Sequence, residues 1–388
     1  MRLQLTVAAV PVSTLALALA GAPGQVRGDE PNTLSFDTLV YSDTDNVLVV
    51  SPQVAAHRTL DDEGGEASAR VSVDIISAAS VDVVSQATSG FTEIRKEANL
   101  AASHRIGSLL PALHYRFSDE PDYRSHSFGG GVSRDFAGHD TTVSLSYDLG
   151  LDTVGRSGTS FSAWSRHLTN HSAEVSVVQV LGPRTVARLG YALTLQNGFM
   201  EKPYRYVPLF DAATLADLES SGMSLDADSV DAYRLPERPP EEVPDRRVRH
   251  ALSARGLRYV PDLGAVQLDY RFYVDSWGLQ THTLDASLKV PIGRFRLDVE
   301  DRLHFQTAAD FWSRAYTVDG DGRIPTWRSL DRELGGYVQD TVFARLQRPF
   351  GAFLVYAMGG SMITRYGDFL YLDWRLALLS ETGVRWQW

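Results

Sequence analysis

Apolar and polar residues alternate one by one along most of this chain, from about residue 32 to the C-terminus. Successive side chains of a β-strand point to opposite faces, so a period of two predicts strands with one apolar and one polar face. In VQLDYRFYVDS, residues 266–276, valine, leucine, tyrosine and phenylalanine fall on one face, and glutamine, aspartate and arginine fall on the other. The pattern therefore predicts an all-β fold.

The polar faces of these stretches distinguish a membrane barrel from a soluble sandwich. In RFRLDVEDRLHF, residues 294–305, arginines and acids alternate opposite the apolar residues, and Asp301 breaks the pattern. Alternating opposite charges are typical of a hydrated interior in which the charged side chains pair with one another, rather than of a face in bulk water. An apolar outer face with a polar inner face is the signature of a transmembrane antiparallel up-and-down β-barrel.

Sixteen strands can be counted, within a range of fourteen to eighteen. They are predicted at 33–43, 46–58, 68–77, 93–103, 109–118, 123–135, 141–151, 171–181, 185–196, 246–259, 264–276, 281–290, 294–306, 333–346, 351–363 and 369–388. With both termini on the periplasmic side, long external loops should follow odd strands and short turns should follow even ones. The long gaps 78–92, 152–170, 197–245 and 307–332 all follow odd strands, which supports the count. Residues 33–388 are therefore predicted to form one barrel with external loops 152–170, 197–245 and 307–332.

The chain ends in GVRWQW, and every second residue from Trp388 back to Leu370 is apolar or uncharged. A last strand that closes a barrel pairs with the first, turns its apolar face to lipid and places terminal aromatic rings in the interfacial girdle. An aromatic final residue after alternating apolar residues also resembles the signal read by the outer-membrane assembly machinery. We assign Val384, Trp386 and Trp388 to this C-terminal assembly signal and expect that machinery as a partner.

The first twenty residues resemble a cleaved secretory signal, with Arg2 before an apolar run that ends in small residues. An uncleaved membrane anchor is the alternative. Residues 21–32 would then form a short segment with no room for a plug, which disfavours energised siderophore-type transport. No later run reaches the length of about 18 apolar residues that a membrane helix needs.

Composition narrows the function classes and the compartment. The absence of cysteine removes disulfides, thiolate metal sites and a cysteine nucleophile, and it fits an oxidising compartment. A formal net charge of −11 argues against nucleic acid as a partner. We therefore expect localisation in the outer membrane of a Gram-negative bacterium, with outer-membrane lipid as the surrounding partner.

Several stretches resemble a bacterial family of uncharacterised outer-membrane proteins that is catalogued only as a domain of unknown function. The strongest is LDYRFYVDSWGLQTHTLDASLKVPIGRFRLDVEDRLHFQTAADFW, residues 268–312, and similar segments occur at 73–80, 91–97, 123–136 and 197–207. The chain departs from the family pattern at Phe272, where a tyrosine is expected, and at Asp285, where a glutamate is expected. The resemblance implies the barrel fold and no particular activity.

Charged residues on the predicted inner face are the best candidates for function, because a barrel of this size can leave a water-filled channel. This lumen charge network comprises Glu93, Arg95, Glu97, Arg247, Arg249, Asp269, Arg271, Arg296, Asp298, Glu300 and Arg302. The network could line a porin-like path for small polar solutes. Close pairing of the same charges could instead hold the interior shut, as in a structural or interaction barrel.

Signals for catalysis and for metal binding are weak. His282, Asp285 and Ser287 share one strand, but their spacing places the histidine on the opposite face from the other two. His304 is expected in the charge network. The motif DGDGR at 319–323 begins like a calcium loop but has arginine in a ligand slot and leucine where the bidentate glutamate should fall. We expect no catalytic residues, no metal and no cofactor, and we rank an outer-membrane enzyme last.

The longest predicted loop is also strongly acidic. Residues 211–245 contain ten acids and two arginines, a net charge of −8. TLADLES, residues 214–220, could form one or two helical turns, and four prolines stiffen the exit of the loop. A solvated surface loop is favoured over a cover for the mouth or a cation-gathering segment.

Overall fold

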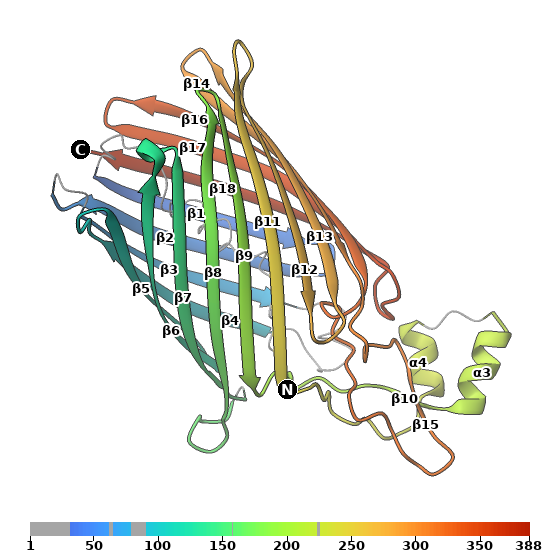
Figure 1. Ribbon diagram of the computed structural model, residues 1–388. Helices are drawn as coiled ribbons and strands as arrows, with labels where there is room; N and C mark the ends of the chain where they lie inside the picture. The colour runs from blue at the N-terminus through green and yellow to red at the C-terminus, as the bar shows by residue number, and fades with distance from the viewer. Residues whose placement is uncertain (1–31, 62–64, 79–90, 157, 223–225) are drawn as a thin grey trace.

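The computed structural model describes residues 32–61, 65–78, 91–156, 158–222 and 226–388. Sixteen antiparallel strands form one closed barrel, in which each strand pairs with its neighbours along the chain and the last pairs with the first (Figure 1). The predicted fold class and strand number are confirmed. The predicted signal 1–20, the segment 21–31 and residues 79–90 of the first long gap lie outside the described residues.

The bounds of the barrel strands agree closely with the alternation of the sequence. They are β1 (Thr33–Asp43), β2 (Val47–Thr59), β3 (Glu66–Ala78), β4 (Phe91–Ser103), β5 (Leu109–Glu120), β6 (Tyr123–Phe136), β7 (Thr141–Val154), β8 (Arg166–Gly182), β9 (Thr185–Gly198), β11 (Arg246–Val260), β12 (Gly264–Asp275), β13 (Gln280–Ile292), β14 (Phe295–Gln306), β16 (Tyr337–Phe350), β17 (Phe353–Tyr366) and β18 (Trp374–Gln387). The largest differences are at β8, which starts five residues earlier than predicted, and at β18, which starts five residues later.

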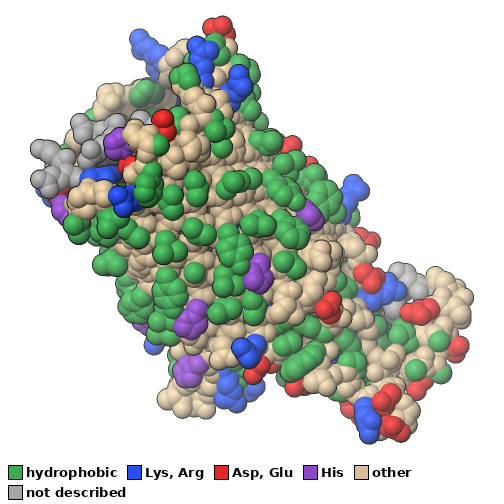
Figure 2. Space-filling view, in the orientation of Figure 1, with side chains coloured by type: hydrophobic (Ala, Val, Ile, Leu, Met, Phe, Trp, Pro, Cys, Tyr) green, Lys and Arg blue, Asp and Glu red, His purple; other side chains and the backbone are tan. Residues whose placement is uncertain are grey.

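The barrel wall has an apolar outer face. Leu252, Leu268 and Leu284 occupy alternate positions of neighbouring strands and are each more than two-fifths exposed. In Figure 2 hydrophobic side chains cover most of the visible barrel wall. The residues between them form the inner face, which carries most of the charge. A water-soluble protein usually has apolar residues inside and charged residues outside, and this barrel has the reverse. The arrangement matches a wall that faces lipid.

The C-terminal strand closes the barrel against both neighbours. Trp386 pairs in register with Leu34 of β1 and with Phe353 of β17, and its indole is 41% exposed on the outer face. The rings of Trp386 and Trp388 stack with centroids 4.5 Å apart. The predicted strand extended back to residue 369, but Phe369 and Leu370 are buried in the connection that precedes β18. Apolar alternation alone could not separate that buried connection from the strand.

Two long connections form a small folded unit beyond one end of the barrel, at the lower right of Figure 1. We call residues 199–245 and 307–336 the loop unit. It contains α3 (Ala212–Ser220), α4 (Ala227–Tyr233), and the parallel strands β10 (Leu209–Asp211) and β15 (Tyr316–Val318). Its own core contains Val207, Phe210 and Leu330, all at most 2% exposed.

Local capping explains where the two helices start. The Asp211 side chain accepts hydrogen bonds from the backbone N–H groups of Ala213 and Thr214, and Asp226 forms a reciprocal capping box with Ser229. The helical turns expected at 214–220 are confirmed as part of α3, whereas α4, β10 and β15 were not predicted. Among the described residues, no helix is long and apolar enough to cross a membrane.

Candidate functional site

The eleven residues of the predicted lumen charge network all occupy the inner-face positions of the wall. They lie in alternation with exposed apolar side chains on four strands, β4, β11, β12 and β14. Arg95 donates to Asp74 over 2.6 Å, Arg116 donates to Glu97 over 2.6 Å, and Arg247 donates to Asp275 through Nε over 2.7 Å. Arg255 pairs with Asp269, and Arg302 pairs with Asp285. The predicted lumen charge network contained only one of the two residues in each of these pairs.

These ion pairs follow the wall instead of crossing the lumen. Among the described barrel strands, each pair joins residues of one strand, of adjacent strands or of strands separated by a single strand. The pair of Arg345 on β16 with Glu381 on β18, whose atoms lie 2.6 Å apart, reaches across one intervening strand. An ion pair between nearby strands does not bring opposite sides of the barrel into contact. These pairs are therefore compatible with an open lumen.

Inner-face glycines make the longer lateral contacts feasible. His114 on β5 reaches across β6 to Asp148 on β7, and it passes over Gly129. A Cβ atom at position 129 would collide with the His114 ring and with the Asp148 carboxylate. Gly129 therefore serves contact between second-neighbour strands rather than a turn.

Two arginines of the network form no ion pair with an acid of the described residues. Arg249 on β11 and Arg271 on β12 lie on either side of Tyr273, and Arg271 is 5.9 Å from the centroid of that ring. The Nε atom of Arg249 is buried without a hydrogen bond. This part of the wall therefore carries uncompensated positive charge.

Buried ion pairs connect the loop unit across the mouth of the barrel. Arg205 lies 2.5 Å from Asp331 and 3.3 Å from Glu241, and Lys202 lies 2.8 Å from Asp331. Arg332 reaches Asp45 in the β1–β2 turn over 2.6 Å. We call Lys202, Arg205, Glu241, Asp331, Arg332 and Asp45 the mouth cluster. It joins three connections that are far apart in the chain, so it holds the loop unit on the barrel.

An apolar contact reinforces the mouth cluster. Tyr204 lies between Lys202 and Arg205 in the chain and is 6% exposed. It packs with Tyr41, Val49, Ile76 and Met362 on the inner face of the wall. The segment 202–205 therefore enters the mouth and narrows it.

Electrostatics favour the charged form of Asp331. Burial alone would raise the pKa of its carboxyl group, but the neighbouring Arg205 and Lys202 outweigh burial and hold the pKa well below its ordinary value. The Asp331 side chain is 8% exposed and that of Arg205 is 4% exposed, so neither charge is well screened by water. Removing one member of such a group leaves its partner charged and buried, which is strongly destabilising.

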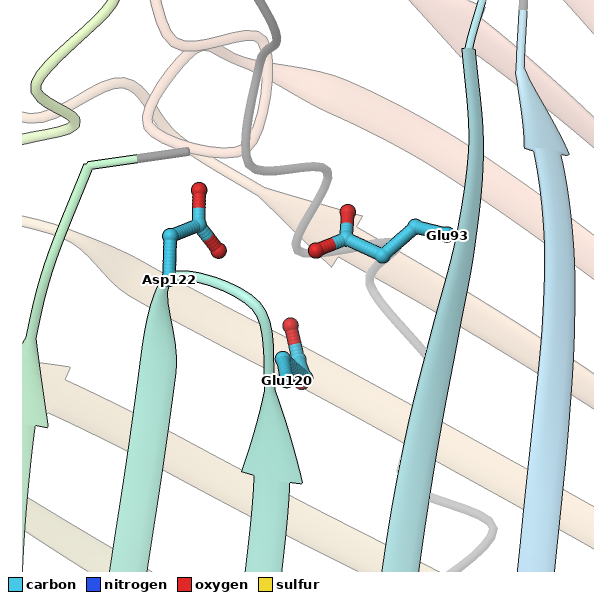
Figure 3. A group of neighbouring side chains, drawn as sticks. All are labelled: Glu93, Glu120 and Asp122. Carbon is cyan, nitrogen blue, oxygen red and sulfur yellow. The ribbon is translucent and has the colours of Figure 1, made fainter. Parts of the chain in front are cut away.

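Three carboxylates gather at the same end of the barrel. Glu93 of β4, Glu120 at the end of β5 and Asp122 in the following turn point toward a common space in Figure 3, with oxygen atoms within 4.8 Å of one another. Oxygen ligands of this kind suit calcium or magnesium. However, the Arg95 guanidinium lies 3.9 Å from Glu120 and supplies a cation within the protein. We therefore assign these three carboxylates to the ion-pair network of the barrel wall and not to a metal site.

The residues considered as catalytic candidates do not come together on one face of the barrel wall. In the strand register His282 falls opposite outward Phe272, whereas Asp285 and Ser287 fall opposite inward Asp269 and Gln267. The prediction that the histidine faces away from the other two is confirmed. Asp319 of the DGDGR motif accepts hydrogen bonds from the backbone N–H groups of Asp321 and Arg323, which closes a surface turn.

The mouth cluster was not predicted, because its members come from loops without periodicity. The one available signal was the charge of segment 197–207, which contains Lys202 and Arg205 in a chain with a net negative charge. The acidic partners lie about 40 and 130 residues further along, and nothing in the sequence specifies that pairing.

A closed antiparallel barrel with an apolar outer wall and a charged inner wall defines this protein as a transmembrane β-barrel. The chain belongs to the family described as "Protein of unknown function (DUF3570)", which matches residues 83–350. No protein of curated function matches the chain.

Solved structures with a similar fold are distant in sequence. CdiB from Acinetobacter baumannii is 11% identical, with 92% of this chain and 61% of CdiB covered and a TM-score of 0.48. The siderophore receptor PirA from Pseudomonas aeruginosa is 9% identical, with 92% and 62% covered and a TM-score of 0.44. A bacterial polysaccharide outer membrane secretin is 9% identical, with 93% and 100% covered and a TM-score of 0.45. The chain thus spans about three-fifths of the first two proteins.

Proposed function

We propose that this protein is an outer-membrane barrel that allows small polar solutes to pass passively through a charged lumen. The observation that carries this proposal is the lateral course of the ion pairs. Most paired charges of the described inner wall are compensated by a near neighbour along the wall, so the interior stays polar without being bridged. Sixteen strands are sufficient for an aqueous channel. The segment 202–205 restricts passage at the mouth and limits the solutes to small ones.

Conductance of the purified, reconstituted barrel tests this proposal. Wild type should give small, voltage-independent steps in planar bilayers. Arg205→Ala should raise the conductance at least about twofold, because losing a buried partner of Asp331 and Glu241 costs roughly 3–5 kcal/mol and loosens the narrowing segment. Arg314→Ala is the matched control: its pair with Asp368 is exposed and at the rim, so conductance should not change.

A structural or interaction barrel with a closed lumen is the second candidate. The mouth cluster favours it, since buried ion pairs hold the segment 202–205 in the opening. An absence of conductance in both wild type and Arg205→Ala, in barrels shown to be folded, would contradict the channel and support this alternative.

A further inference from the structure

Four tyrosine–histidine pairs repeat on the outer face of the barrel. In each pair a tyrosine hydroxyl contacts the Nδ1 atom of a histidine on the neighbouring strand, two positions away in the register. The pairs are Tyr115–His126 at 2.9 Å, Tyr147–His171 at 2.7 Å, Tyr191–His250 at 2.8 Å and Tyr270–His282 at 2.7 Å. We call these eight residues the Tyr–His belt.

The belt runs around half of the barrel at one level. Its pairs occupy β5–β6, β7–β8, β9–β11 and β12–β13, which are consecutive strand pairs in the wall. Each histidine lies between the third and the sixth residue of its strand, counted from the strand end that faces the loop unit: His282 is the third residue of β13, and His171 is the sixth of β8. Figure 2 shows histidines spaced in a row across the apolar face at that end.

The pairing leaves one ring nitrogen of each histidine available. With the tyrosine hydroxyl donating to Nδ1, the neutral ring carries its hydrogen on Nε2, and the cationic ring carries a hydrogen there as well. Among the described residues, Nε2 of these four rings has no hydrogen-bond partner. The tyrosine thus orients each ring and leaves a donor at the outer face.

Positive charge lies just beyond the belt, on the side toward the loops. Arg166 starts β8 and Arg246 starts β11; both are exposed and make no ion pair with a described residue. Arg124 of β6 also lies there and is paired with Asp119 over 2.8 Å. Nitrogen donors on an apolar wall with cations at its edge complement an anionic headgroup above acyl chains.

We propose that the Tyr–His belt binds the phosphate groups of anionic membrane lipids in the leaflet on the loop side of the barrel. The acyl chains lie on the apolar wall, the phosphate accepts hydrogen bonds from histidine Nε2, and the arginines beyond the belt attract its charge. The proposal rests on the membrane placement given above and not on solute passage.

Lipid binding to the full-length barrel in detergent tests the belt, with bound lipid counted by native mass spectrometry. The probes are dioleoyl phosphatidic acid and dioleoylglycerol, which share acyl chains and differ in the phosphate. Wild type should prefer phosphatidic acid by about tenfold or more. The variant His126→Phe, His171→Phe, His250→Phe and His282→Phe keeps aromatic rings but removes the donors, and it should lose most of this preference.

A control variant carries phenylalanine on the same outer face without touching the belt. Leu48, Leu346, Ile363 and Leu378 are exposed on β2, β16, β17 and β18, strands that carry no belt residue, so phenylalanine at these positions should leave the preference unchanged. Equal binding of the two lipids by wild type, or a fourfold histidine variant that keeps the preference, would overturn the proposal. If the fourfold variant does not assemble, His171→Phe alone must lower the preference. Conductance of the same preparations reports separately on the proposed channel.

Discussion

Individual inner-face residues differ in how completely their charge is compensated. Arg302 and Arg255 each form an ion pair with an aspartate across the strand pair, whereas Arg249 and Arg271 form none among the described residues. Asp275, which lies opposite Arg249 in the register, pairs with Arg247 instead. Their charges produce a positive electrostatic potential inside the lumen. Low-dielectric walls concentrate such a field, so it selects ions by the sign of their charge. These two arginines are therefore the residues expected to give the proposed channel an anion preference.

Replacing both, as Arg249→Gln and Arg271→Gln, should shift selectivity toward cations. In bilayers with a tenfold salt gradient, the wild-type reversal potential should indicate anions and that of the double variant should move toward zero or change sign. Arg255→Gln on the same strand leaves Asp269 uncompensated and shifts selectivity in the same direction, so it measures how much a paired arginine contributes. A reversal potential that is identical for wild type and the double variant would contradict the assignment.

Asp331 allows a prediction about pH. Its folded pKa lies below the ordinary value of 3.8, so its stabilisation of the mouth is fully present above that pH and is lost as pH falls through the folded pKa. Protease protection of residues 199–245 should therefore be equal at pH 8 and pH 5. Asp331→Asn should be cut faster at both values. Protection that declines in wild type between pH 8 and pH 5 would show that another group controls the mouth.

At the scale of elements, the helical part of the loop unit is separable from the mouth. The Leu235 N–H donates to the Leu209 carbonyl over 2.7 Å, so the chain before α3 and the chain after α4 are already in contact. Replacing residues 212–234 with a short glycine–serine linker should preserve barrel closure and the mouth cluster, since neither helix supplies a member of it. Heat-modifiable migration on a denaturing gel and unchanged conductance would support this.

Loss of the folded form in that deletion would show that α3 and α4 help assemble the barrel. A milder loss is expected within the loop unit, because Leu218 and Val230 contribute to its core. Substituting Leu218→Ala in the intact chain measures that contribution separately, at about 2–5 kcal/mol for the loop unit alone.

Elements that follow a period were predictable from the sequence, and elements that depend on distant partners were not. The inner or outer face of Arg271 or Leu268 follows from the pleat, so alternation places every wall residue once the strand is recognised. The parallel pairing of β10 with β15 joins segments about 100 residues apart and has no local signature. For the same reason Lys202 and Arg205 could be recognised as charged loop residues but not matched to Asp331.

The whole molecule depends on one closing contact between the ends of the chain, and this gives the final prediction. β18 pairs with β1 along eleven residues, from Thr33–Gln387 to Asp43–Ala377. Trp386 and Trp388 sit on the outer face at the end of that pairing, where aromatic rings are favoured at the membrane interface. Replacing both with aspartate should cost at most about 2–4 kcal/mol in the finished barrel, and less near the interface.

The larger effect of Trp386→Asp with Trp388→Asp should therefore be on assembly, seen as a several-fold lower amount of heat-modifiable protein in the outer-membrane fraction. Gln387→Asn is the control, because Gln387 lies between the two tryptophans and faces the lumen, so its level should match wild type. Equal outer-membrane levels of wild type and the double aspartate variant would show that the terminal tryptophans are not an assembly signal. Reduced levels with Gln387→Asn as well would instead mean that any change at the closing seam disturbs strand pairing.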